Sequence, residues 1–116
     1  MHSPSPPPVD WARLLDILDQ DRAAACELAQ VFIEMGVQAV QEMMAAAEQQ
    51  DCETAAKRAH KLKGASASIQ APAMAAASSR LELAARDGQT ELLAGLAQDV
   101  KLEFERAAEC LRAFAA

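Results

Sequence analysis

A single histidine, His60, lies in the alanine-rich middle of the chain, within the run HKLKGASAS that spans residues 60–68. A neutral imidazole is a competent nucleophile near neutral pH, and it can carry a transferred group on a ring nitrogen. Lys63 follows the histidine by three residues and Gly64 by four. A lone histidine of this kind is usually an ordinary surface residue, but the lysine and the glycine favour a reactive imidazole.

Two other uses of histidine are disfavoured. A metal site is not expected, because no second histidine or suitably spaced cysteine lies near His60. A serine–histidine hydrolase is not expected either, because the sequence predicts no strand and no nucleophile elbow. Cys26, Cys52 and Cys110 lack metal-binding or redox spacing, and we expect them to be reduced and mostly buried.

The charge distribution indicates an anionic partner. The net charge is −6, which disfavours nucleic-acid binding through phosphate contacts. Four of the eleven basic residues nevertheless fall within seven positions, namely Lys57, Arg58, Lys61 and Lys63. A basic spot on an acidic body suggests an anionic surface as partner. The simpler interpretation is a solvated helix face.

The composition predicts an all-α fold of one domain. Apolar residues make up 52% of the 116 residues and aromatic residues 3%, and alanine, the best helix former, dominates. Residues 1–8 are rich in proline and are expected to form a disordered tail, so that residues 9–116 form the domain. His2 lies in this tail and is given no role. Caps and apolar periodicity predict helices over about residues 11–18, 22–49, 52–69, 72–87 and 90–114.

Short links between the last four helices predict an antiparallel four-helix bundle with a short additional N-terminal helix. Asp10, Asp21 and Asp51 are the expected N-caps, Pro72 fits a first helical turn, and Gly88 a helix end. In the second helix, Gly36 interrupts the expected core stripe and suggests close helix packing. The members of that stripe are Leu28, Val31, Phe32, Met35, Ala39 and Met43.

At 100° per residue, His60 lies about 145° from the centre of its helix's apolar stripe and therefore faces water. Gly64 lies one turn along the same outward face. A mid-helix glycine costs stability, which makes sense if it gives a partner access to the imidazole. Ala56 and Ala67 flank this face, and lysines surround it at positions 57, 61 and 63.

The run AHKLKGASASIQA resembles the signature of histidine phosphotransfer (HPt) domains of two-component phosphorelays: a histidine, then a hydrophobe, lysine, glycine and small residues. LELAARDG (81–88) resembles the family's LE-x-x-A-[KR]-x-G segment, and Leu14, Leu28 and Phe32 follow its N-terminal pattern. The resemblance covers about residues 10–114 and implies a four-helix bundle. One departure is Gln70, where the family often has glycine, so that the helix end there must close differently, with Ser68 as a candidate helper.

The resemblance implies that phosphorylated His60 relays a phosphoryl group between the aspartates of receiver domains. It implies that Glu82, 22 residues after His60, orients the imidazole, and that Lys63 stabilises the phosphoryl oxygens. From the residues alone, the simpler interpretation of Glu82 is an exposed helix glutamate paired with Arg86. Further assignments are Gly64 for partner access, Arg86 as a helper or docking residue, and docking or steering contacts at Lys57, Lys61, Ala56 and Ala67.

The implied partners are response-regulator receiver domains, with a hybrid sensor kinase as a further candidate. No resident cofactor is expected, and Mg²⁺ would belong to the receiver. Lys61 follows His60 where autokinase helices read H-E, and no glycine-rich phosphate loop is found, so we expect a transfer intermediate rather than an autonomous kinase.

No apolar run approaches a membrane span and no secretory signal is recognised, so we expect a cytoplasmic monomer without membrane contact. A non-catalytic helical adaptor and a degenerate HPt that binds receivers without transfer remain the alternatives.

Overall fold

The computed structural model describes residues 7–116, and within that range the chain forms five α-helices and no strand. The expected Pro-rich tail lies outside the described residues except for its last two positions, so it stays a prediction. The helices are α1 (Trp11–Ile17), α2 (Arg22–Glu48), α3 (Cys52–Ser68), α4 (Pro72–Arg86) and α5 (Thr90–Ala115). Their bounds agree closely with those expected from the sequence.

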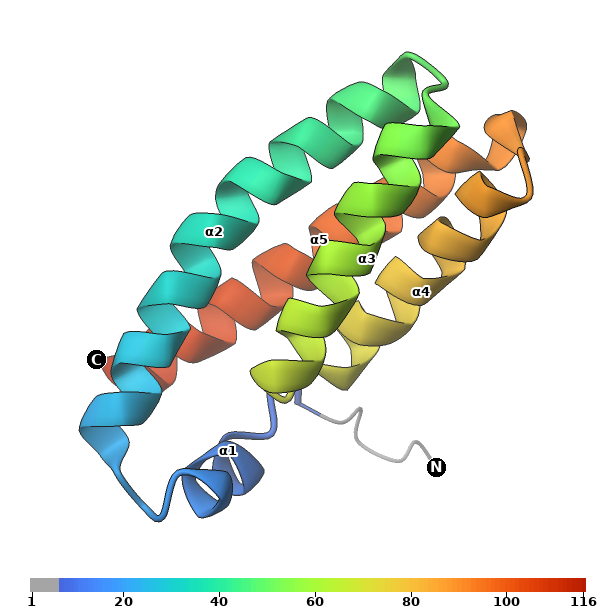
Figure 1. Ribbon diagram of the computed structural model, residues 1–116. Helices are drawn as coiled ribbons and strands as arrows, with labels where there is room; N and C mark the ends of the chain where they lie inside the picture. The colour runs from blue at the N-terminus through green and yellow to red at the C-terminus, as the bar shows by residue number, and fades with distance from the viewer. Residues whose placement is uncertain (1–6) are drawn as a thin grey trace, which may run out of the picture.

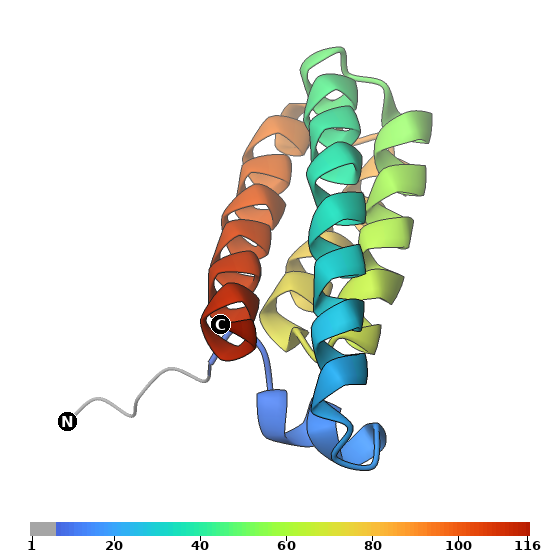
Figure 2. The same ribbon diagram turned by 90° about the vertical axis from the view of Figure 1, so that its left-hand side faces the viewer.

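The four long helices form a closed bundle (Figure 1). Helix α2 packs on α3 and α5, and α4 packs on the same two helices. Seen from the side, the long helices run nearly parallel or antiparallel to one another, and α1 lies at one end of the bundle (Figure 2). The predicted all-α fold, a four-helix bundle with a short additional N-terminal helix, is therefore confirmed.

Helix starts follow the predicted capping residues. The Asp10, Asp21 and Asp51 side chains accept hydrogen bonds from backbone N–H groups three residues on, at 3.0, 3.0 and 3.1 Å. Each bond satisfies one of the N–H groups left free at a helix start. Pro72 occupies the first turn of α4, where its missing N–H costs nothing.

The helix ends share one closure. After α3, Gln70 adopts the left-handed conformation with φ +64°, its N–H bonds to the Ala67 carbonyl, and the Ala71 N–H bonds to the Ser66 carbonyl. This pair of bonds is the Schellman motif. The same pattern closes α4 at Gly88, with φ +70°.

Gln70 thus takes the conformation that glycine favours, and Ser68, the expected helper, is exposed and takes no part in the closing bonds. The side-chain amide of Gln70 also takes part, because its Nε2 donates to the Ala67 carbonyl at 3.0 Å. The Gln70 carbonyl accepts the Asp10 N–H at 2.8 Å. The end of α3 is therefore tied to the start of α1.

The core stripe of α2 differs from the prediction. Val31 is 61% exposed and Leu28 37%, although both were expected in the core. The buried positions of α2 are Ala25, Ala29, Phe32, Gly36, Ala39, Val40, Met43, Ala46 and Ala47. In an alanine-rich helix, small residues can form the packed face and leave larger aliphatic residues outside, so side-chain size misled the prediction.

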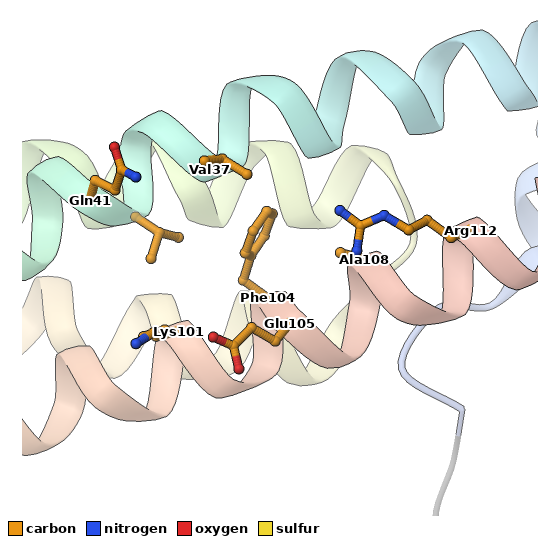
Figure 3. Close-up of a pocket in the computed structure, with 8 residues that line it drawn as sticks. Val37, Gln41, Lys101, Phe104, Glu105, Ala108 and Arg112 are labelled. Atoms are coloured by element: carbon orange, nitrogen blue, oxygen red, sulfur yellow. The ribbon is translucent and has the colours of Figure 1, made fainter.

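Gly36 of α2 lies directly against the Phe104 ring of α5. A Cβ atom on Gly36 would come within 2.2 Å of Phe104 Cε1, so the ring occupies the space that a side chain would need. Figure 3 shows Phe104 extending from α5 towards α2, in the groove that Val37 also lines. The Phe104 ring also packs on Phe32, with centroids 5.8 Å apart. The predicted reason for this glycine, close helix packing, is confirmed.

The short helix α1 is held against the C-terminal end of α5. The Trp11 ring stacks on Phe114 with centroids 5.2 Å apart, and Arg22 lies over the Trp11 ring at 5.8 Å. Arg22 also donates a hydrogen bond to the Phe114 carbonyl. Trp11 is therefore a packing anchor, as its spacing predicted.

Helix α2 has the predicted length but is more apolar than expected from the sequence. Among the described residues it alone is long and apolar enough to cross a membrane, with mean hydropathy 1.3 over an 18-residue window, which corrects the expectation that no stretch approaches that length. This is weak support for a membrane span, since core helices of bundles pass the same test. The buried face of α2, from Ala25 to Ala47, already packs inside the bundle.

Candidate active site

His60 lies on the outward side of α3, next to α4. Its side chain is 65% exposed, as the helical periodicity predicted. Its Nδ1 atom lies 3.0 Å from Glu82 Oε2 on α4. The histidine therefore presents most of its ring to solvent while one nitrogen is held from the neighbouring helix.

Glu82 is the buried member of this site. Its side chain is only 8% exposed, and both of its oxygens have cationic partners. On Oε2, Arg86 Nε donates at 3.0 Å and Arg86 Nη2 at 2.7 Å, in addition to the His60 contact. On Oε1, Lys63 Nζ lies at 3.4 Å. Glu82 is thus a junction between α3 and α4, and not the exposed glutamate that the residues alone also allowed.

Opposing effects set the ionisation of Glu82. Burial acts to raise the pKa of this carboxyl, but hydrogen bonds from Arg86 and Lys63, together with the charges of Lys63 and His60, outweigh burial. The pKa of Glu82 therefore lies below its ordinary value of 4.5, and the group is a carboxylate at neutral pH. A buried carboxylate would be costly without these partners.

The ionised carboxylate determines the tautomer of His60. A carboxylate can only accept hydrogen bonds, so the Nδ1 atom at 3.0 Å must carry the proton that it donates. In a neutral ring, Nε2 is then left with its lone pair. The arrangement holds a nucleophilic nitrogen on an exposed ring, which suits it to accept an electrophilic group from a partner.

Gly64 leaves the approach to the imidazole open. Apart from its chain neighbours and the backbone of its own helix, a Cβ atom placed on it would meet no described atom within 4 Å. Ala67, expected beside this face, is exposed. Ala56, also expected there, is only 5% exposed. Ala56 lines a surface hollow together with Ala85 of α4. At this exposure it offers little surface to a partner, so the expectation is corrected.

The predicted basic spot is divided between different roles. Arg58 is half-buried and pairs with Glu42 on α2 at 2.5 Å, so it ties two helices together. Lys57 pairs with Glu53 at 3.3 Å, and both side chains are largely exposed. Lys61 is exposed and makes no ion pair within residues 7–116. Exposed pairs contribute little stability, so Lys57 and Lys61 remain available to an acidic partner.

Sequence reasoning placed His60, Lys63, Glu82 and Arg86 in one functional set, and the structure brings all four together. It missed that Arg86 and His60 use the same oxygen of Glu82. Only a three-dimensional arrangement can show which acceptor atom two donors share. The spacing of four residues between Glu82 and Arg86 was the available signal, and it indicated a pair on one helix face.

Other reactive groups lie elsewhere. Cys26, Cys52 and Cys110 are free and half-buried, so they are less buried than expected. Among residues 7–116, no group of three or more histidine, cysteine, aspartate or glutamate side chains is placed to hold a metal ion. The histidine, glutamate, lysine and arginine between α3 and α4 are the chemical centre that the described residues provide.

The family comparison bears directly on this centre. Residues 27–110 match the family model described as Hpt domain, which covers His60 and all of its partners. The chain belongs to the Hpt domain family. A search of curated proteins finds no match. Hpt domains function in histidine phosphotransfer in two-component signalling. In this signalling they interact with receiver domains and kinases.

A solved structure shows the same fold. The crystal structure of histidine-containing phosphotransfer protein B (HptB) from Pseudomonas aeruginosa PAO1 superposes with a TM-score of 0.87 and is 22% identical in sequence. The alignment covers 96% of each chain. At this identity the likeness concerns the fold, which this Hpt domain shares over nearly its whole length.

Proposed function

We propose that His60 accepts a phosphoryl group from the aspartyl phosphate of one receiver domain and passes it to the aspartate of another. The observation that carries this proposal is the contact between His60 Nδ1 and Glu82 on a ring that is 65% exposed. Family membership supplies the reaction class, and the contact makes His60 a competent acceptor.

In the transfer step, the Nε2 lone pair attacks phosphorus and an N–P bond forms. The P–O bond to the receiver aspartate breaks, and the carboxylate leaves with the electron pair. The ring then carries positive charge, because Nδ1 keeps its proton. Glu82 stabilises this charge through the bond at 3.0 Å, and the reverse step regenerates the neutral ring.

Lys63 is the proposed partner of the phosphoryl oxygens. Its Nζ atom lies 3.4 Å from Glu82 Oε1, its side chain is 42% exposed, and it stands on α3 one turn after His60. Phosphoryl transfer depends mainly on positioning and on neutralising charge, which a flexible ammonium provides. The proposal includes no resident cofactor, and Mg²⁺ would bind to the receiver domain.

The proposed partners are receiver domains with an acidic surface, and a hybrid sensor kinase that carries such a domain. Lys57, Lys61 and Ala67 would contact the receiver, and Gly64 would leave room for it. Lys57 and Lys61 would raise the rate of encounter by long-range attraction, an effect that salt reduces. We propose that the protein acts as a cytoplasmic monomer.

The test is transfer from phosphorylated receiver domains. The full chain is mixed with receiver domains that carry labelled phosphate, and the label on this protein is followed with time. We expect acid-labile phosphate on the wild type and none on His60→Gln. A receiver that binds without losing its label would support a degenerate HPt, and label on His60→Gln would also overturn the proposal.

A further inference from the structure

Glu82 is held by its two cationic partners in different ways. Arg86 contacts one oxygen, Oε2, through two donors, Nε at 3.0 Å and Nη2 at 2.7 Å. Lys63 makes one longer contact with the other oxygen, at 3.4 Å. Arg86 therefore makes the shorter and more directional contacts, and it makes them to the oxygen that also accepts the His60 Nδ1 proton.

We propose that Arg86 is a positioning residue, which fixes the buried carboxylate of Glu82 and thereby the reactive tautomer of His60. This role deepens the proposed phosphotransfer function and rests on it. The Arg86 side chain is 58% exposed, but its Nε and Nη2 atoms are both engaged with Glu82. These bonds give Arg86 a more specific role than the docking residue or general helper expected from the sequence.

The argument starts from the cost of the buried charge. The Glu82 side chain is only 8% exposed, so without Arg86 its only strong cationic partner would be Lys63 on Oε1. The carboxylate would then turn towards Lys63 or take up a proton, and either change weakens the bond from His60 Nδ1. A histidine without that acceptor exchanges freely between its two tautomers.

The two cations also differ in what they are free to do. Lys63 has one contact at 3.4 Å, so it can leave Glu82 for a phosphoryl group on Nε2. Arg86 makes two closer bonds, and it lies four residues from Glu82 on the same helix. Arg86 therefore continues to compensate Glu82 while Lys63 serves the phosphoryl group.

The test uses the free, unphosphorylated protein and needs no partner. Histidine is labelled with ¹⁵N, and the chemical shifts of Nδ1 and Nε2 are measured by NMR at alkaline pH, where imidazoles are neutral. We expect the Nδ1–H tautomer to predominate in the wild type. Arg86→Met should change the tautomer ratio of His60 several-fold towards Nε2–H.

Three variants make the result specific. Lys63→Met should leave the tautomer ratio close to that of the wild type, although it slows transfer. Arg80→Met removes the same charge from α4 at an exposed position outside the site, and it should change neither property. Arg86→Lys keeps the charge with one donor group and should give an intermediate ratio.

Transfer from a phosphorylated receiver should be roughly tenfold slower for Arg86→Met, as expected when one charge-assisted hydrogen bond is weakened. Receiver affinity should stay unchanged. A wild-type tautomer ratio in Arg86→Met, with the fold intact by circular dichroism, would overturn the role of Arg86 and leave phosphotransfer standing. Weaker receiver binding at an unchanged ratio would also overturn it, in favour of docking. If the ratio changes but no receiver transfers label, Arg86 positions His60 and the relay proposal fails instead.

Discussion

At the scale of single residues, the site depends on a carboxylate that is buried and yet ionised. The Glu82 side chain is 8% exposed, but Arg86, Lys63 and His60 all lie against it, and they hold the pKa of its carboxyl below the ordinary value of 4.5. Because the ionised Glu82 carboxylate can only accept a hydrogen bond, His60 must donate one from Nδ1. The tautomer of an exposed imidazole is thus set by a group that is itself buried.

Replacing Glu82 separates orientation from docking. Glu82→Ala removes the acceptor of the His60 Nδ1 proton, a charge-assisted hydrogen bond of about 1.5–3 kcal/mol. Transfer should therefore slow by roughly ten- to hundredfold. Rates are followed with a labelled receiver, and receiver affinity is measured separately by calorimetry.

Glu82→Gln is the matched control. An amide oxygen can still accept from Nδ1. This variant should therefore transfer faster than Glu82→Ala. Receiver affinity should be nearly the same for both variants, because Glu82 is buried. Wild-type rates in Glu82→Ala would remove the orienting role assigned to this residue.

At the scale of the helices, two of the Schellman closures are made by glutamine in a conformation that glycine favours. Gln50 and Gln70 close α2 and α3 with φ +55° and +64°, whereas Gly88 closes α4. A side chain in this region costs roughly 1–2 kcal/mol because its Cβ crowds the following carbonyl oxygen. These two helix ends therefore carry backbone strain that their neighbours must offset.

Gln70→Gly should relieve that strain at the end of α3. We expect the free energy of unfolding to rise by about 1 kcal/mol, which corresponds to a few degrees in the melting temperature. Thermal and urea unfolding provide the measurement. Gln49→Gly is the control, because Gln49 has φ −85° and glycine should there give no gain. Equal changes in the free energy of unfolding for Gln70→Gly and Gln49→Gly would show that Gln70 is not strained.

The approach of α2 to α5 offers a second test at this scale. Gly36→Ala would place Cβ 2.2 Å from Phe104 Cε1. The ring is packed on Phe32, so the helices must separate or the ring must move out of the core. Overpacking of this kind costs about 1–3 kcal/mol, which exceeds the gain of up to about 1 kcal/mol in helix propensity.

Gly95→Ala is the matched control for Gly36→Ala. Gly95 also lies inside a helix, α5, but a Cβ there would meet no described atom within 4 Å apart from its chain neighbours and its own helix backbone. Urea unfolding should show Gly36→Ala to be less stable than the wild type and Gly95→Ala more stable. Stabilisation by both changes would show that the α2–α5 contact is not tight.

At the scale of the whole molecule, the site couples acidity to stability. The cations that lower the pKa of Glu82 lie on both α3 and α4, so an ionised Glu82 helps to hold these two helices together. In the unfolded chain the carboxyl regains its ordinary pKa of 4.5. The stabilisation is therefore fully present above about pH 4.5 and is lost as the pH falls through the lower pKa of the folded protein.

Urea unfolding at neutral pH and at about pH 3.5 tests this coupling. We expect the wild type to lose stability on acidification, with a contribution also from Asp51, whose pKa is lowered mainly by its hydrogen bonds to Thr54. Glu82→Gln cannot ionise at this position, so it should lose less stability over the same interval. An equal loss in both proteins would show that Glu82 contributes nothing to the acid response.

The sequence by itself determined the helices, their caps and the outward direction of His60. These features depend on local rules: aspartate caps, apolar periodicity and the rotation of 100° per residue. The observed helix bounds therefore agree with the predicted ones within a residue or two. The family's spacing also pointed to Glu82, because two antiparallel helices of fixed rise bring positions 22 residues apart together.

Only the tertiary structure decided which small residues form the core and which atoms meet. In α2, alanine and glycine are buried while Val31 is exposed, since packing depends on how closely two backbones approach. Ala56 is buried for the same reason, although helical geometry alone placed it near the outward face. The shared oxygen of Glu82, with His60 on one side and Arg86 on the other, depends on side-chain positions across two helices, which no spacing in the sequence records.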